Sequence, residues 1–133
     1  MRHLGIDYGS KRIGLALSDE AGDFAFPYAV IDNGRRTLKQ LEEICKKEGV
    51  AKIVMGESLD YQGKPNVIMP AIHKLAKSLK EETGLPVEFE KEFMTSAEAA
   101  RLQGANEKID ASAAALILKS YLERKKFLEE QRT

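Results

Sequence analysis

The hydrophobic pattern of this chain changes its period near residue 37, and no other feature constrains the fold as strongly. Upstream of that point, three short apolar segments follow one another at residues 2–7, 12–18 and 24–31. The stretches between them are rich in residues that are typical of turns. We therefore expect the chain to begin with three antiparallel strands joined by short connections.

The second part of the chain alternates helix-like and strand-like segments. Leu38, Leu41 and Cys45 recur at helical spacing, whereas the segments "AKIVMG" and "PVEFEKEF" are strand-like. The expected elements are helix, strand, helix, strand and two final helices, at residues 37–49, 51–56, 66–84, 86–93, 95–103 and 109–131. Strands joined through a helix form right-handed crossovers. The order predicts an α/β fold: a five-stranded mixed sheet, three antiparallel strands first and then αβαβ, flanked by helices.

Two helix starts and one helix stop have a recognisable signature. Thr37 with Gln40, and Thr95 with Glu98, have the spacing of a capping box, in which two side chains satisfy free backbone N–H groups. Gly49 follows the last apolar position of the first helix, where glycine commonly ends a helix. We expect helices to begin at both threonines.

Length and charge limit the kind of protein further. The 133 residues are enough for one domain spanning 1–133 with a single core. Lys+Arg and Asp+Glu both number 21, so any site for a polyanion has to be local. Cys45 is the single cysteine, which excludes a disulfide within the chain and favours a reducing, cytoplasmic location. No apolar run has the length of a membrane span, so we expect no membrane partner.

Asp7 is an acid at the end of a segment that otherwise resembles a buried strand. Strand alternation places Gly5 and Asp7 on one face, and Leu4, Ile6 and Tyr8 on the other. Two interpretations remain open from the residues alone. Asp7 is either a turn residue whose side chain bonds the following backbone, or an acid that the sheet presents to a ligand.

The segment "VEFEKEFM" alternates acids with apolar residues. Glu88, Glu90 and Glu92 share one side of the expected strand, and an edge strand with one solvated face explains Glu88 and Glu90. Glu92 differs by position, since it lies at the carboxyl end of the strand, where open α/β sheets bind their ligands.

Asp110 lies in the first turn of the expected last helix. An acid at this position is commonly an N-cap or a partner of the helix dipole. However, the positions above it, Ala114, Ile117 and Tyr121, form a largely apolar stripe, which predicts that Asp110 faces inward. An inward-facing acid requires a partner.

Three acids brought together repel one another. A pair of charges about 4 Å apart costs roughly 4 kcal/mol at an effective dielectric constant near 20. Mg²⁺ or Mn²⁺ relieves such repulsion, because both ions prefer carboxylate oxygens and retain waters. Of two such ions, one can activate a water and the other can stabilise the leaving oxygen of a phosphodiester. This chemistry is that of a metal-dependent nuclease.

The motifs that surround these acids resemble those of the YqgF (RuvX) family. The resemblance covers nearly the whole chain through "IDYGSKRIGLALSD", "IVMG", "EFMTSAEA" and "KIDASAAALILKSYLE". It implies a ribonuclease H-like fold. Carried over by position, it implies that Asp7, Glu92 and Asp110 are the catalytic residues and bind Mg²⁺ or Mn²⁺. It also implies that Lys11 and Arg12 match a basic pair, which we assign to contacts with substrate phosphates.

The resemblance implies a hydrolase of ester bonds, a nuclease that processes the ends of pre-16S rRNA in ribosome biogenesis. Expected partners are structured nucleic acid, pre-rRNA first and branched DNA second, together with a second copy of the chain in a homodimer. Three alternatives remain: a Holliday junction resolvase, an ATP-binding domain of the actin and Hsp70 superfamily, and a nucleic-acid-binding module with weak catalysis. The last is motivated by Glu57, Ser58, Lys91 and Phe93, which depart from the family pattern.

Overall fold

The computed structural model describes residues 1–59, 67–93 and 107–131. Its elements, in chain order, are β1 (Arg2–Tyr8), β2 (Arg12–Ser18), β3 (Ala25–Asp32), α1 (Thr37–Glu48), β4 (Val50–Leu59), α2 (Met69–Thr83), β5 (Val87–Phe93) and α4 (Glu107–Gln131). The expected helix at 95–103, with its capping box at Thr95, lies outside the described residues. No helix in the described part of the chain is both long and apolar enough to cross a membrane.

The five strands form one mixed sheet with the order β3-β2-β1-β4-β5. β1 pairs antiparallel with β2, and β2 pairs antiparallel with β3, as the meander predicts. β1 and β4 are parallel, and so are β4 and β5. The carboxyl ends of β1, β4 and β5 therefore meet at one edge of the sheet, which we call the carboxyl edge. The predicted fold class is confirmed.

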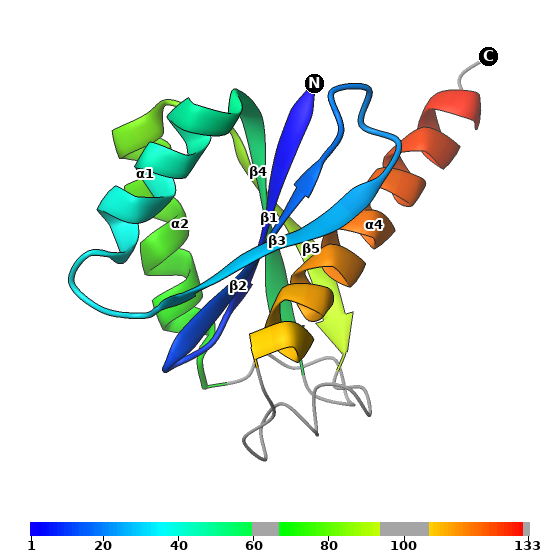
Figure 1. Cartoon of the computed structure of the whole chain (residues 1–133). Coiled ribbons are helices and arrows are strands. Elements are labelled where there is room, and N and C mark those ends of the chain that lie inside the picture. Colours follow the sequence, from blue (N-terminus) through cyan, green and yellow to red (C-terminus); the bar gives the residue numbers. More distant parts are fainter. Residues whose placement is uncertain (60–66, 94–106, 132–133) are drawn as a thin grey trace.

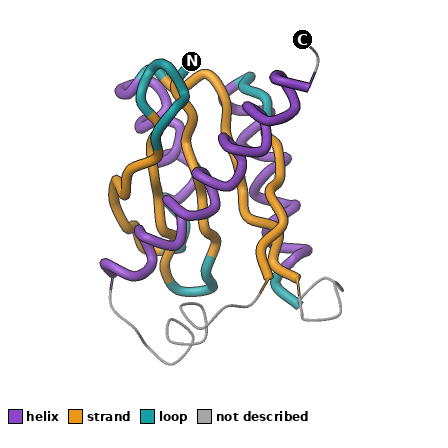
Figure 2. The backbone as a smooth tube through the Cα atoms, turned by 90° about the vertical axis from the view of Figure 1, so that its right-hand side faces the viewer, coloured by secondary structure: helices purple, strands orange, loops and turns teal. Residues whose placement is uncertain are grey.

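Helices cover the sheet on both faces (Figure 1). α1 and α2 pack on one face and α4 on the other, so the molecule has three layers. Turned by 90°, α4 crosses in front of the strands (Figure 2). Its first turn lies at the carboxyl edge, and its last turns lie at the opposite end, beside the start of β1 (Figure 1).

Two apolar clusters correspond to the two faces. The larger one joins the sheet to α1 and α2 and includes Leu4, Ile6 and Leu41. The smaller one joins the sheet to α4 through Val54, Ala114 and other residues of that helix. Leu4 and Ile6 thus point away from α4, as the alternation predicts. Along α4, the apolar stripe of Ala114, Ile117 and Tyr121 is buried, which is also as predicted.

The first helix begins at Thr37, as expected, although the predicted capping box is absent. Gly49 ends α1 with a left-handed backbone (φ 65°), a conformation that favours glycine. The capping box at Thr37 does not form, because Arg36 is the N-cap and Thr37 is already helical. Its hydroxyl instead donates to the Asp32 carbonyl (3.2 Å) and accepts from the Gly34 N–H (2.8 Å), so that it fixes the loop before the helix.

Candidate active site at the carboxyl edge

Asp7 is the penultimate residue of β1 and is buried, with 3% of its surface exposed. Its partner on β2 is Gly14. On the other side, Ile6 pairs with Met55, so Gly56 follows directly beside Asp7. Glycines on both neighbouring strands leave the Asp7 carboxylate without flanking side chains from the sheet. A buried carboxylate in such a place has to be compensated by cations or hydrogen-bond donors, since burying a charge alone is costly.

The position of α4 over β1 depends on Gly5, two residues before Asp7. A methyl group at Gly5 would lie 2.9 Å from Cβ of Leu118 and 3.1 Å from the Ala114 carbonyl oxygen. Glycine is therefore required for the helix to approach β1 this closely. Because Gly5 and Asp7 share a face, Asp7 also lies on the side of the sheet that α4 covers.

Asp110 is the fourth residue of α4, in the turn of the helix that lies at the carboxyl edge. It precedes Ala114 by one helical turn, about 6 Å, and Asp7 follows Gly5 by a similar distance along the strand. α4 runs from the carboxyl edge upward while β1 runs downward (Figure 1). The contact at Gly5 and Ala114 thus sets the backbones of Asp7 and Asp110 at one end of the molecule. The side chain of Asp110 lies outside the described residues.

Glu92 lies near the end of β5, paired with Ser58 of β4. It shares strand parity with Glu88 and Glu90, both of which contact α4. The backbone of Glu92 therefore lies at the carboxyl edge. Its parity with Glu88 and Glu90 places the residue on the face of the sheet that α4 covers. Its side chain is not among those described. Within the described side chains, no group of three His, Cys, Asp or Glu lies close enough to hold a metal ion.

Lys11 and Arg12 lie at the same edge, where β1 turns into β2. The turn is tied to the loop after β3: the Asn33 side-chain amide donates to the Gly9 carbonyl (2.9 Å), and its backbone N–H donates to the Lys11 carbonyl (2.9 Å). Lys11 is exposed and Arg12 is half-buried. Two cations therefore lie at the rim of the carboxyl edge, close in sequence to Asp7 near the end of β1.

A polar network that joins β5 to the carboxyl-terminal half of α4 was not predicted from the sequence. Glu90 is buried at 8% exposure rather than solvated, so the expectation of a wet face on β5 is wrong for this residue. Arg124 donates two hydrogen bonds to its Oε1 (3.0 and 2.8 Å), and the Ser120 hydroxyl donates to its Oε2 (2.8 Å). The available signal was the i,i+4 spacing of Ser120 and Arg124 on a helix that has to cover a strand of acids.

Glu88 makes a second connection between β5 and α4. It accepts a hydrogen bond from the Tyr121 hydroxyl, and Lys52 of β4 lies 3.6 Å from its Oε2. Lys52 also donates to the Tyr121 hydroxyl (3.3 Å). The two networks hold the carboxyl-terminal half of α4 to β5, the strand that carries Glu92 near its end.

The arrangement is that of a ribonuclease H-like protein. Solved structures with the same fold include Thermus thermophilus RuvC bound to a Holliday junction substrate, with a TM-score of 0.60 at 15% identity over 95% of this chain and 96% of that one. The fowlpox virus Holliday junction resolvase has a TM-score of 0.55 at 13% identity, covering 93% and 99% of the two chains. At these identities the likeness shows the fold alone.

The sequence comparison is more specific. Residues 1–124 match the RuvX family model, described as Holliday junction resolvase, and the chain belongs to this family. A protein of Maridesulfovibrio salexigens, provisionally named a pre-16S rRNA nuclease, is 35% identical over 93% of this chain and 99% of its own length. A protein of the same provisional name from Anaplasma marginale is 33% identical over 94% and 86%. The predicted family is confirmed.

Proposed function

We propose that this chain is a divalent-metal-dependent nuclease that hydrolyses phosphodiester bonds in structured nucleic acid, with the ends of pre-16S rRNA as its substrate. The observation that carries the proposal is the buried Asp7 carboxylate at the carboxyl edge, on the face of the sheet that α4 covers. Acids on the two elements that border this edge, Glu92 of β5 and Asp110 of α4, complete the proposed set.

The donor set fits a hard divalent cation. Carboxylate oxygens are the ligands that Mg²⁺ and Mn²⁺ prefer, and Asp7 is buried enough to gain from a cation beside it. We assign Asp7, Glu92 and Asp110 as the residues that hold the metal. When bound, Mg²⁺ or Mn²⁺ supplies a Lewis acid for phosphodiester hydrolysis.

The remaining roles fall to the chain's own cations. Lys11 and Arg12 contact substrate phosphates beside the cleaved bond, and their place at the rim suits a phosphate backbone that runs along the edge. Such contacts position a nucleic acid without reading its sequence. Glu90 and Arg124 keep α4 seated on β5, so that the acids on the two elements keep their separation.

We choose RNA as the substrate because the relatives that match nearly the whole chain are named as pre-16S rRNA nucleases. Branched DNA is the second candidate, because the family is described as Holliday junction resolvase and the Thermus thermophilus RuvC structure holds a Holliday junction substrate. The comparisons give less support to an ATP-binding domain. We further propose that residues 1–133 form one domain acting in the cytoplasm, as a monomer or a homodimer.

The proposal is tested by cleavage of three labelled substrates: precursor rRNA ends, single-stranded RNA and a four-way DNA junction. Each is incubated with EDTA, Mg²⁺ or Mn²⁺ and with the native chain, Asp7→Asn or Glu43→Gln. Glu43 is exposed on α1, so Glu43→Gln removes the same charge far from the edge. Losing a metal ligand removes several kcal/mol of transition-state stabilisation, so we expect Asp7→Asn to lower the rate about a thousandfold.

Three outcomes are decisive. Metal-dependent cleavage that Asp7→Asn abolishes and Glu43→Gln leaves intact supports the proposal, and the preferred substrate decides between RNA and branched DNA. Cleavage that persists in EDTA contradicts the proposed dependence on a divalent metal. Binding of all substrates with no cleavage in either metal favours the binding module instead.

A further inference from the structure

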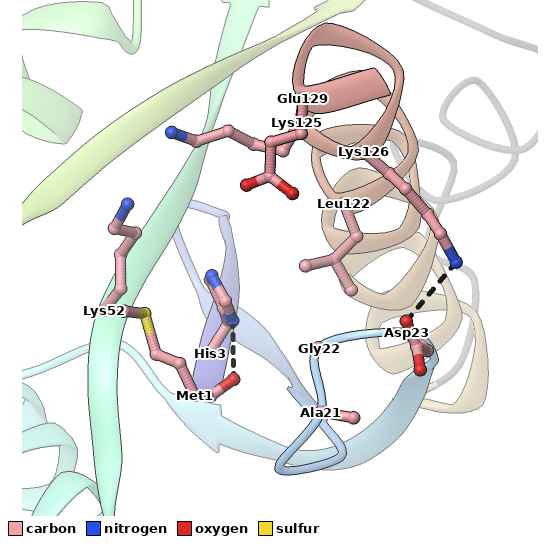
Figure 3. A pocket seen from close by; sticks show the side chains of 10 residues that line it. All are labelled: Met1, His3, Ala21, Gly22, Asp23, Lys52, Leu122, Lys125, Lys126 and Glu129. Atoms are coloured by element: carbon pink, nitrogen blue, oxygen red, sulfur yellow. Dashed lines mark hydrogen bonds and ion pairs between the residues drawn. The ribbon is translucent and has the colours of Figure 1, made fainter. Parts of the chain in front are cut away.

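A cavity of about 280 Å³ opens at the end of the molecule opposite the carboxyl edge. It lies between the start of β1, the β2–β3 turn and the last turns of α4 (Figure 3). Lys125 follows Asp110 by 15 residues of α4, about 22 Å of helix, so the cavity is separate from the candidate active site. The polar side chains that line it are His3, Asp23, Lys52, Lys125, Lys126 and Glu129.

One of these groups is buried and a second is largely covered. His3 is 8% exposed, and the side chain of Lys52 is 15% exposed. His3 Nδ1 lies 3.2 Å from the Met1 carbonyl, which accepts the proton of that nitrogen. The second ring nitrogen points away from Met1, toward the space between Lys52 and Lys125 (Figure 3).

The imidazole of His3 is held in its neutral form. Burial lowers the pKa of His3, the Met1 carbonyl opposes this shift, and the charge of Lys52 lowers the pKa further. With Nδ1 carrying the proton, Nε2 presents a lone pair to the cavity. The cavity thus combines cationic donors with one buried acceptor.

Positive charge is concentrated at this end of α4. The charged groups of Lys52, Arg124 and Lys125 all lie within 6.0 Å of the centre of the Tyr121 ring. Arg124 is paired with Glu90, and Lys52 with Glu88. Lys126 is paired with Asp23 at 3.4 Å. Among the described residues, no carboxylate lies within ion-pair distance of Lys125, so this ammonium group can donate to a bound anion without first breaking an ion pair.

We propose that this cavity binds a phosphate monoester, with Lys52 and Lys125 donating to its oxygens and His3 Nε2 accepting the proton of its P–OH group. A monoester has a second pKa of about 6, so it keeps such a proton at mildly acidic pH, near that value. A phosphodiester has none to donate. The ligand is a terminal phosphate of a nucleic-acid chain, a mononucleotide or inorganic phosphate, which share this chemistry.

The test follows amide chemical shifts of the full, isotope-labelled chain in EDTA during titration with uridine 5′-monophosphate. Uridine is the control ligand, because it lacks only the phosphate. Lys125→Ala is compared with Lys119→Ala, which removes the same charge from an exposed position of α4 outside the cavity. A third variant, Glu129→Gln, removes a negative charge from the cavity wall.

We expect saturable shifts at His3, Gly22 and Leu122 with the nucleotide and none with uridine. Lys125→Ala should raise the Kd about tenfold, the loss expected for one hydrogen bond to a charged group, whereas Lys119→Ala should leave it unchanged. Glu129→Gln should lower the Kd, because it removes repulsion. A variant that fails to fold would bind more weakly, so tighter binding by Glu129→Gln cannot result from misfolding.

The proposal is overturned if the shifts do not saturate by about 10 mM, well above a Kd of ~1 mM. It is also overturned if Lys119→Ala weakens binding as much as Lys125→Ala. Inorganic phosphate and a short RNA with or without a 5′-phosphate then identify the source that binds most tightly. Asp7→Asn should bind normally, so this result is independent of nuclease activity.

Discussion

The two faces of the sheet use the same strands for different purposes. On the face covered by α1 and α2, β1 contributes Leu4 and Ile6 to a large apolar cluster. On the face covered by α4, the alternate residues of the same strand are Gly5 and Asp7. One face supplies apolar burial, and the other supplies close packing and a buried acid.

The difference shows how the fold tolerates a costly site. Keeping Asp7 and Glu90 buried reduces the stability available from the α4 face, because charged groups gain little from leaving water. The apolar face compensates, since its side chains are of the type that contributes about 1.5–3 kcal/mol each when fully buried. We therefore expect mutations on the two faces to have different consequences for stability and activity.

The largest effect on stability is expected from Leu41→Ala, on the apolar face. Leu41 is fully buried in α1, and a Leu→Ala change in a core costs about 2–5 kcal/mol. Chemical denaturation measures the loss, while the rate per folded molecule should stay unchanged. Leu116→Ala, at an exposed leucine of α4, is the control and should cost under about 0.5 kcal/mol. An equal loss in both variants would contradict the difference between the faces.

Gly5→Ala should have a smaller effect on stability but a clear effect on activity. The added methyl group collides with Leu118 and with the backbone of Ala114, which costs roughly 1–3 kcal/mol and displaces α4 from β1. Thermal unfolding and the cleavage rate should both decrease. Gly34→Ala adds the same methyl group where nothing lies within 4 Å, so it should leave both unchanged. Normal activity in Gly5→Ala would show that the approach of α4 does not position the site.

The smallest effect is expected from the pair Glu90 and Arg124. A double-mutant cycle with Glu90→Gln and Arg124→Met should give a coupling energy of about 1 kcal/mol, because the Arg124 side chain is half exposed and partly screened. The same cycle on the helix pair Glu42 and Lys46, whose lysine is exposed, should give about 0.3–0.5 kcal/mol. If the coupling energy of Glu90 and Arg124 is no larger than that of Glu42 and Lys46, the pair does not hold α4 to β5.

Local patterns in the sequence were sufficient to predict most of the fold. The alternation of Leu4, Gly5, Ile6 and Asp7 assigns each residue to its face, and it needs no knowledge of the rest of the chain. Gly49 likewise carries its own signal, since few other residues adopt its backbone conformation. The stripe of Ala114, Ile117 and Tyr121 along the last helix was also predicted from its spacing, and these residues are buried.

Tertiary contacts explain what the sequence could not predict. Glu90 has the same local pattern as a solvated strand residue, and only the packing of Arg124, 34 residues later, buries it. Thr37 has the spacing of a cap, but its hydroxyl bonds the end of β3 instead. β4 also continues three residues beyond the predicted Gly56, because β5 pairs with it as far as Leu59.

The proposed mechanism depends on a divalent metal bound by Asp7 at the carboxyl edge, and Mn²⁺ titration of the isotope-labelled chain tests this most directly. Bound Mn²⁺ broadens the signals of nearby amides. We predict selective broadening at Tyr8, Gly9 and Gly56, none at His3 or Gly22 at the opposite end, and loss of the effect in Asp7→Asn. Broadening that is uniform, or equally strong in Asp7→Asn, would contradict the metal site and the mechanism built on it.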